Sequence, residues 1–172
     1  MMCGITGTPG TGKSSAADEL GLRGYSVVHL TETVKGYIVG EDRERDTRII
    51  DEDRWAREFT PVEGFVEGHL AHLLPCDKVV ILRCRPDILL VRLRSRGYRE
   101  EKCRENAEAE ALDVCLIETL EGHAPEHVLE LDTTEIPPGR VADLIEDFLK
   151  GRVPPSHGGI DWSGFLLEAV WS

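Results

Sequence analysis

Residues 7–14 of the chain read Gly7-Thr8-Pro9-Gly10-Thr11-Gly12-Lys13-Ser14. This segment fits the pattern G-x-x-x-x-G-K-[ST], which is typical of loops that bind nucleotide phosphates. Its glycines let successive backbone N–H groups point inward, and such a nest suits phosphate oxygens. Lys13 would place its charge on the β- and γ-phosphates, and Ser14 would offer its hydroxyl to Mg²⁺. The sequence therefore predicts a phosphate-binding loop with Lys13 as a catalytic residue.

The residues on both sides of this loop support the same interpretation. A short, mostly apolar run precedes it, as expected for a first buried strand. Residues 13–22 can form a helix that ends near Gly21 and Gly24. The N-terminal dipole of that helix would attract the same anion. The alternative is a glycine-rich turn between a strand and a helix that binds no ligand.

The composition indicates one domain. The chain has 172 residues, 41% of them hydrophobic. No apolar run in it approaches the ~18 residues of a membrane-spanning helix. Its five cysteines are scattered without a C-x-x-C pair, which argues against a disulfide framework and against a four-cysteine zinc site. We expect a soluble, cytoplasmic protein with mostly buried cysteines and no membrane partner.

The charge is strongly acidic but uneven. The formal net charge is −12, whereas residues 83–104 hold eight basic and three acidic side chains. An acidic surface repels nucleic acid, and a basic island within it favours an anionic ligand. Beside a phosphate-binding loop, we interpret this island as a contact for polyphosphate. The alternative is a solvated helix face.

Apolar runs and helical periods alternate along the rest of the chain. After the first strand, further strands are expected at residues 25–30, 64–69, 78–83 and 127–131. Helices are expected after a Thr31 cap and at residues 70–74, 86–96, 100–121 and 141–149. Strands that alternate with helices behind an N-terminal phosphate-binding loop predict an α/β P-loop NTPase with a doubly wound, five-stranded, largely parallel sheet.

Two segments lack the periodicity of core elements. Residues 41–57 are dense in charges of both signs, so we interpret them as a mobile insert. Arginines of this insert could hold the phosphate of a second substrate, although surface ion pairing is the alternative for each of them: Arg43, Arg45, Arg48 and Arg54. Residues 151–159 look like a linker, and residues 160–171 like a short apolar helix that Asp161 caps. That helix would dock on the domain or bind a partner.

Polar residues follow the predicted third and fifth strands. Glu67 would lie at the carboxyl end of its strand, which is where open α/β sheets bind ligands. His69 is a candidate for a group near the transferred phosphate. His69 and His72 could instead form a metal pair, but two histidines alone rarely make a site. Asp132 resembles a Walker B aspartate, but a last strand more often belongs to the base-binding side.

Several motifs together resemble the adenylate kinase isoenzyme 6 family over roughly residues 1–150, with an archaeal flavour. An insert after the second strand, an arginine-rich hinge after the fourth strand and the lack of an N-K-x-D motif already favour a nucleoside monophosphate kinase over a GTPase. The motifs that carry the closer resemblance are residues 7–14, Glu67-Gly68-His69-Leu70, Arg92-Leu93-Arg94-Ser95-Arg96-Gly97-Tyr98, Glu105-Asn106-Ala107-Glu108-Ala109-Glu110 and Leu131-Asp132-Thr133-Thr134.

The resemblance implies a role for each matching position. The residues that would bind ATP are Gly10, Gly12, Lys13, Ser14, Ser15 and Arg96. Ser14 would ligate Mg²⁺ through its hydroxyl, and Glu67 through water. Glu67 stands where the family usually has another acid before x-His, and His69 would be a catalytic helper. Residues 1–150 would form the kinase domain, with an AMP-binding insert at about 30–53 and a short lid at about 96–106, followed by residues 151–172 as linker and apolar helix.

The resemblance also implies the reaction. The family transfers a phosphoryl group from ATP to AMP with Mg²⁺, giving two ADP, and acts as an ATPase in small-ribosomal-subunit assembly and pre-rRNA maturation. ATP and AMP would therefore be substrates, and a small-subunit ribosomal protein and the pre-ribosome would be partners. The alternatives are an ATPase switch that acts only as an assembly factor, and a P-loop kinase for another nucleoside monophosphate.

Overall fold

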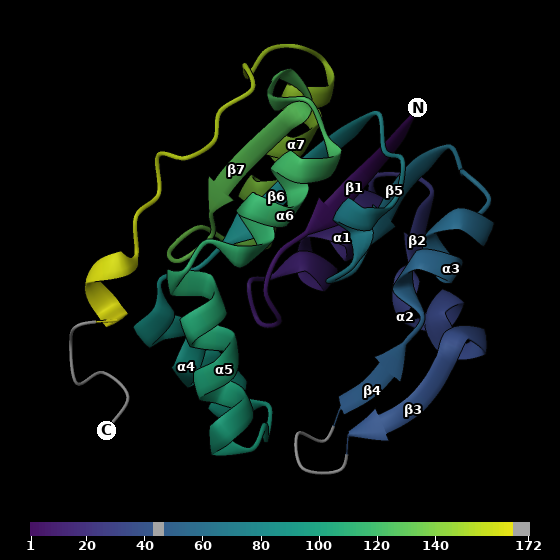
Figure 1. Ribbon diagram of the computed structural model, residues 1–172. Coiled ribbons are helices and arrows are strands. Elements are labelled where there is room, and N and C mark those ends of the chain that lie inside the picture. Colours follow the sequence, from purple (N-terminus) through teal and green to yellow (C-terminus); the bar gives the residue numbers. More distant parts are fainter. Residues whose placement is uncertain (43–46, 167–172) are drawn as a thin grey trace.

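A five-stranded parallel sheet forms the centre of the computed structural model, which describes residues 1–42 and 47–166 (Figure 1). The strand order is β2-β5-β1-β6-β7. The strands are β1 (Met2–Thr6), β2 (Val27–His29), β5 (Gly64–Glu67), β6 (Lys78–Arg83) and β7 (Val128–Asp132). All four neighbouring pairs are parallel, with β1 between β5 and β6. The predicted five-stranded parallel sheet is confirmed.

Helices cover both faces of this sheet, as the predicted doubly wound fold requires. One face packs on α1 (Lys13–Leu22) and α7 (Pro138–Leu149). The other packs on the 3₁₀ turn η2 (Ala71–Leu73), on α3 (Glu52–Glu58) and on α6 (Val114–Gly122). Strand β6 supplies both cores, since Val80 and Leu82 belong to the first and Val79 and Ile81 to the second. This alternation explains why β6 is a continuous apolar run.

The segment after β2 is folded where the structure describes it. It contains α2 (Leu30–Thr33), the 3₁₀ turn η1 (Val34–Tyr37), the antiparallel pair β3 (Ile38–Asp42) and β4 (Thr47–Ile50), and then α3. Our interpretation of residues 41–57 as a mobile insert is wrong for α3, because Trp55 is 1% exposed and packs in the second core. Arg43 and Arg45 lie outside the described residues.

The predicted helix 100–121 is two helices, α5 (Glu100–Ala111) and α6, and this prediction was therefore wrong in its extent. Asp113, between them, has a left-handed backbone with φ of 57°. The cause is Arg83, whose Nη2 donates to the Glu110 carbonyl oxygen at 2.8 Å and to Asp113 Oδ1 at 2.6 Å. The Glu110 carbonyl therefore has a partner outside the helix, and the chain turns.

Other predicted boundaries need correction. Strand β2 spans three residues rather than 25–30, and α2 begins at Leu30 directly after His29, so Thr31 is not its cap. The predicted helix 70–74 is the 3₁₀ turn η2. Helix α7 begins at Pro138 instead of residue 141, since proline suits the first helical turn. Helix α4 (Pro86–Ser95) agrees with the prediction, and Gly97 ends it with a φ of 78°.

The C-terminal segment runs along the edge of the sheet. After the 3₁₀ turn η3 (Pro125–His127) and β7, Ser156 pairs with this edge strand, donating to the Val128 carbonyl and accepting from the Glu130 N–H. The described part of the predicted helix 160–171 is the 3₁₀ turn η4 (Ser163–Leu166), which contacts α5. The rest of that prediction lies outside the described residues. Within residues 1–42 and 47–166, none of the helices is both long and apolar enough to span a membrane.

Candidate nucleotide-binding site

The loop between β1 and α1 lies at the carboxyl end of the central strand. Lys13 is buried, and its Nζ donates to the carbonyl oxygens of Gly7 at 2.8 Å and Thr8 at 3.0 Å. Burial, opposed by the nearby Glu67 carboxylate, lowers the pKa of Lys13 to about 8. The ammonium group is therefore held inside the loop, where an incoming anion would restore the stabilisation that burial removes.

Glycine at position 7 follows from close packing. Its φ is 140°, and a Cβ there would lie 2.3 Å from the Leu82 carbonyl oxygen on β6. Any other residue would push the loop away from the sheet. This approach places Gly7 and the following residues directly over the ends of β1 and β6.

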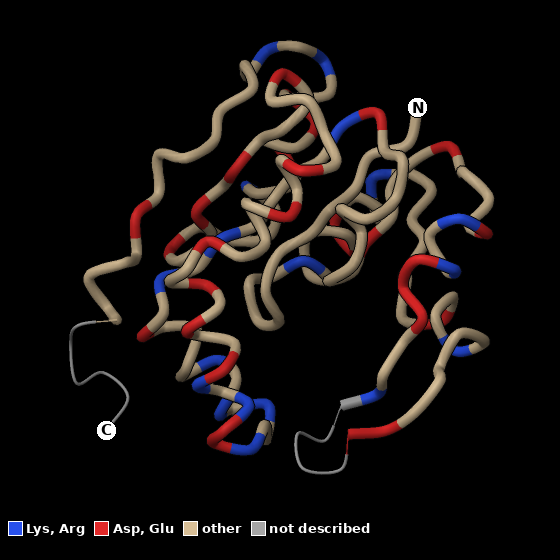
Figure 2. Tube along the Cα trace, viewed as in Figure 1, with Lys and Arg blue, Asp and Glu red and all other residues tan. Residues whose placement is uncertain are grey.

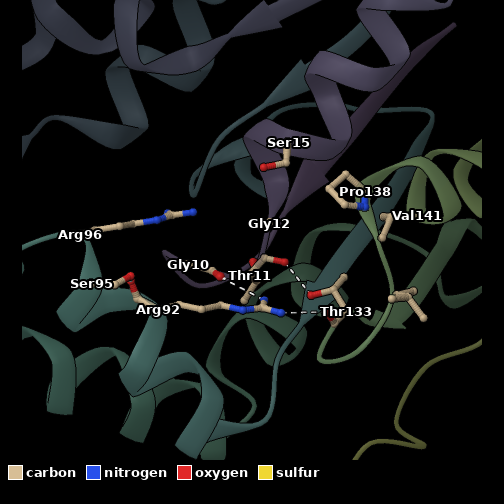
Figure 3. Close-up of a pocket in the computed structure, with 11 residues that line it drawn as sticks. Gly10, Thr11, Gly12, Ser15, Arg92, Ser95, Arg96, Thr133, Pro138 and Val141 are labelled. Atoms are coloured by element: carbon tan, nitrogen blue, oxygen red, sulfur yellow. Dashed lines mark hydrogen bonds between the residues drawn. The ribbon is translucent and has the colours of Figure 1, made fainter.

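A cavity of about 290 Å³ opens on one side of the loop (Figure 3). Arg92 from α4 and Arg96 just after it extend toward the loop from the same side. Arg92 is fixed by the carbonyl oxygens of Gly10 at 3.4 Å, Thr133 at 3.1 Å and Thr134 at 3.0 Å. Arg96 has no hydrogen bond or ion pair within the described residues, so its guanidinium is available to an anion.

The predicted ATP-binding residues meet at this cavity or beside it. Its lining includes Gly10, Gly12, Ser15 and Arg96, together with Arg92 and Thr133. Lys13 lies within the loop, and Ser14 is exposed at the start of α1. Thr133 also ties the loop to the sheet, because its hydroxyl bridges the carbonyl oxygens of Thr11 and Arg83.

Glu67 lies beside Ser14 on the neighbouring strand. The Ser14 hydroxyl donates to Glu67 Oε1 at 3.2 Å, and His29 Nδ1 lies 2.8 Å from Glu67 Oε2. Glu67 is 5% exposed, so both carboxylate oxygens are largely screened from water. A hydroxyl beside a buried carboxylate offers the oxygen ligands that Mg²⁺ prefers.

His69, just before η2, and His72, within η2, have different surroundings. His69 Nδ1 lies 3.3 Å from the Gly7 carbonyl oxygen, so Nδ1 carries the proton and Nε2 presents a lone pair. Poor hydration of its ring and the charge of Lys13 lower the pKa of His69, although the residue keeps exposed surface in a cavity. His72 instead points into the core and contacts Thr6 Oγ1 at 2.9 Å and Glu118 Oε2 at 3.1 Å.

The alternative of a His69–His72 metal pair has no support in this geometry. Among the described residues, no group of three or more histidines, cysteines or acids could hold a metal ion. All five cysteines are free and buried, as predicted.

A second cavity, of about 360 Å³, opens on the other side of the loop. It lies between the segment after β2 and helix α5, and Figure 1 shows the β3–β4 hairpin and the α4–α5 pair on opposite sides of the space beyond the strand ends. Its polar lining residues, together with Pro9 of the loop, are Thr31, Arg48, Glu52, His69, Lys102 and Asn106. Pro9 and Gly10 are neighbours, so the two cavities meet at the loop.

Most basic side chains of residues 83–104 form ion pairs with neighbouring acids. Basic and acidic residues lie interspersed along α4 and α5 (Figure 2). Arg85 pairs with Asp87, Arg94 and Arg104 with Glu100, and Arg99 with Glu101. The interpretation of the whole island as an anion site was therefore too broad. Arg92, Arg96 and Lys102 line the two cavities described here, and Lys102 also lies 3.9 Å from Glu105.

Sequence reasoning missed several of the residues that the fold gathers here. Arg92 and Thr133 were not among the predicted site residues, although both stand in the quoted motifs. Lys102 and Asn106 carried no assigned contact. Their i, i+4 spacing could have indicated a shared helix face directed at a ligand.

Comparison with known proteins shows the family to which the chain belongs. The family model AAA_18, described as “AAA domain”, matches residues 3–113, which is more than half of the chain. The chain belongs to the AAA_18 family. A protein of Methanothermobacter thermautotrophicus is 47% identical over 97% of this chain and 99% of its own length, and one of Archaeoglobus fulgidus is 45% identical over 99% and 96%. Both relatives carry the name “Putative adenylate kinase”. The chain also belongs to the family of these archaeal proteins.

Solved structures agree with this AAA_18 member in fold. A sugar kinase from Janibacter aligns with a TM-score of 0.56 at 18% identity, covering 87% of this chain and 94% of its own. A deoxyadenosine kinase from M. mycoides aligns with a TM-score of 0.52 at 15% identity, covering 87% and 100%. The predicted P-loop NTPase fold is confirmed, and the isoenzyme 6 branch stays a prediction from the motifs.

Proposed function

We propose that this protein is an adenylate kinase, which transfers the γ-phosphoryl group of ATP to AMP and gives two ADP. The observation that carries the proposal is the pair of cavities that meet at the phosphate-binding loop, at Pro9 and Gly10. A transfer between two nucleotides needs a donor site and an acceptor site on either side of the transferred group. The names of the archaeal relatives support the same reaction.

The donor nucleotide would occupy the cavity of Figure 3, its phosphates on the loop. Gly10, Gly12, Ser14 and Ser15 would offer backbone N–H groups or hydroxyls at the N-terminal end of α1. Lys13 would leave its carbonyl partners for the β- and γ-phosphates. Thr133, which also lines the cavity, follows the last strand, and the base would lie on this side.

The acceptor would bind in the second cavity. This assigns residues of the insert at about 30–53, including Thr31 and Arg48, to AMP. The lid, at about 96–106, begins with Arg96 in the donor cavity and ends with Asn106 in the acceptor cavity. Closure of this short lid over both nucleotides would exclude water, so that AMP rather than water attacks.

Two side chains of this protein are suited to the Mg²⁺ that such kinases use. Ser14 and Glu67 would hold it, Ser14 through its hydroxyl and Glu67 through water, since they bring a hydroxyl and a buried carboxylate together. When bound, the ion neutralises charge on the β- and γ-phosphate oxygens.

Phosphoryl transfer needs positioning and charge neutralisation more than covalent chemistry. Lys13 and Arg96 would stabilise the charge spread over the transferred group. Neutral His69, with Nδ1–H held by Gly7, would turn Nε2 toward the acceptor as a hydrogen-bond acceptor for an ordered water or phosphate proton.

A second candidate is the ATPase cycle of a small-subunit assembly factor, which the motif resemblance implies. An acidic surface favours it, since the net charge of −12 suits a basic ribosomal protein better than direct contact with RNA. A lid of about ten residues that closes incompletely would allow some hydrolysis of ATP.

The deciding experiment supplies ATP, Mg²⁺ and each nucleoside monophosphate in turn while ADP and free phosphate are measured together. An adenylate kinase forms ADP with AMP and releases no matching phosphate. Equal turnover with another nucleoside monophosphate would mean that the protein is a kinase for that acceptor as well. Phosphate release without any acceptor preference would reject the kinase and leave the ATPase switch.

A further inference from the structure

A buried carboxylate, Glu110, connects helix α5 to the phosphate-binding loop. Its side chain is 1% exposed. Oε2 accepts a hydrogen bond from Thr8 Oγ1 at 2.6 Å, and Oε1 accepts from Arg83 Nε at 2.7 Å and from the Cys84 N–H at 3.1 Å. Three donors therefore fix the carboxylate, although Glu110 lines neither cavity.

On the loop side, the partner Thr8 holds Lys13 in place. Thr8 is 3% exposed, and its carbonyl oxygen accepts hydrogen bonds from Lys13 Nζ at 3.0 Å and from Thr11 Oγ1 at 2.8 Å. A displacement of Thr8 would therefore move both the lysine that meets the donor phosphates and the backbone of the loop.

On the helix side, Glu110 shares a face with acceptor-cavity residues. Lys102, Asn106 and Glu110 follow one another at intervals of four on α5, and such residues lie along one side of a helix. Lys102 and Asn106 line the acceptor cavity. The eight steps from Lys102 to Glu110 span about 12 Å of helix, so one rigid element joins this cavity to the loop.

The far end of α5 is anchored to the sheet. Arg83, 1% exposed on β6, pairs with Glu110, with Asp113 and with Glu130 of β7. The helix ends beside this cluster, and α6 starts in a new direction after the left-handed Asp113. The end next to Glu110 is therefore held by the sheet. The end that bears Lys102 packs on α4 through Cys103 and Ala107, both 0% exposed, so α4 and α5 would have to turn together about the anchored end.

We propose that the Thr8–Glu110 hydrogen bond couples the two nucleotide sites, with Glu110 as a positioning residue. An acceptor that engages Lys102 and Asn106 sets the orientation of α5, and Glu110 passes this orientation to Thr8 and so to Lys13. The inference rests on the proposed function, because it assigns the second cavity to the acceptor nucleotide.

The test removes the bond from the Thr8 side. Truncation of Glu110 would leave Arg83 buried with one carboxylate fewer, which would threaten folding. Thr8→Val keeps the shape of the side chain and removes the hydroxyl, Thr8→Ala removes it without placing a methyl against the carboxylate, and Thr8→Ser retains it. Thr119→Val is the matched control, because Thr119 is 0% exposed and, among the described residues, its hydroxyl donates to the Cys115 carbonyl on α6.

The measurement is the affinity for the Mg²⁺ complex of the non-hydrolysable analogue β,γ-imido-ATP, by titration calorimetry, with and without saturating AMP. We expect AMP to change this affinity at least about fivefold in the wild type, which is the lower range of coupling between sites. Thr8→Val and Thr8→Ala should reduce the change to less than about twofold, while Thr8→Ser and Thr119→Val keep the wild-type factor.

A wild-type factor retained in both Thr8→Val and Thr8→Ala would overturn the inference, and so would a factor below twofold in the wild type. A bond that merely supports the fold would lower the melting temperature and leave the coupling factor unchanged. The proposed function is judged separately, by ADP formation from ATP and AMP. Wild-type turnover with unaltered coupling in the variants would reject this inference and keep the kinase.

Discussion

At the scale of single residues, the site depends on charges that the fold keeps unsatisfied or only weakly satisfied. The Lys13 ammonium group is shielded from water and donates to two carbonyl oxygens, and Arg96 has no charged partner within the described residues. Carbonyl partners stabilise an ammonium group less than phosphate does. Such residues are held ready for an anion, whereas neighbouring arginines such as Arg94 are already neutralised.

Lys13→Ala should abolish most of the turnover without unfolding the protein. The loss of one preorganised charge at the transferred group typically lowers kcat by about 100-fold or more. ADP formation from ATP and AMP measures the effect, and a thermal melt followed by circular dichroism checks the fold. Lys35→Ala is the control, since Lys35 is exposed and pairs with Glu32. Activity within tenfold of the wild type would show that the lysine was wrongly assigned.

Arg96→Ala should lower kcat about 100-fold and leave the melting temperature within a degree or two, because no described contact of Arg96 stabilises the fold. Arg94→Ala, two residues away on the same turn, should change turnover less than threefold, since that guanidinium pairs with Glu100 on the surface. The two variants are compared in the same ADP assay. Equal losses in both would mean that the basic segment acts only through its overall charge.

At the scale of elements, tertiary contacts decide what local propensity leaves open. Helix α3 is rich in charge along the sequence, yet Trp55 anchors it in the second core and its Nε1 donates to Thr33 Oγ1 at 3.1 Å. The anchored helix closes the chain after the β3–β4 pair and brings the insert back to the sheet. The wall of the second cavity that Glu52 of α3 contributes is therefore a packed part of the domain.

Trp55→Ala should lower the free energy of unfolding by about 3 kcal/mol or more, because a buried aromatic ring is lost. Trp55→Phe keeps an aromatic ring in the core but loses the hydrogen bond to Thr33. The lost hydrogen bond should lower the free energy of unfolding by about 1 kcal/mol. Urea denaturation of both variants gives the values. A loss below 1 kcal/mol for the alanine variant would mean that α3 is not part of the cooperative fold.

At the scale of the whole molecule, both faces of the sheet are covered. The burial of a histidine under this cover should make the fold less stable at low pH. His72 on η2 is 2% exposed and lies among Thr6, Cys115 and Glu118, with His123 at its backbone. Burial, aided by His123, lowers the pKa of His72 from 6.5 to about 4. The unfolded chain therefore binds this proton more readily than the folded protein does.

The free energy of unfolding should consequently fall as the pH is lowered from about 6.5 to about 4, with up to about 3 kcal/mol due to His72. Well above pH 6.5 the ring is neutral in both states, and its contribution is constant. Urea unfolding at intervals across this range measures the slope. His72→Gln cannot titrate and should flatten the slope, while the same replacement of exposed His127 should not. An identical slope in both variants would contradict the assignment.

The order of elements and the phosphate-binding loop could be predicted because their signals are local. Gly7 to Ser14 specify a loop, Lys78–Arg83 specify a strand buried on both faces, and Pro86 and Gly97 mark the ends of α4. The break after α5 could not be predicted, because it depends on Arg83, 27 residues before the Glu110 carbonyl that it binds. Local periodicity across residues 100–121 favours one continuous helix.

The sequence by itself determined the P-loop fold and the place of Lys13 and Ser14 in the loop, since each follows from neighbours a few residues apart. Only the tertiary structure decided which arginines remain available, how Glu67 meets Ser14, and that two cavities share the loop. These features join residues dozens of positions apart, and the parallel sheet brings them together by placing the carboxyl ends of its strands at one edge.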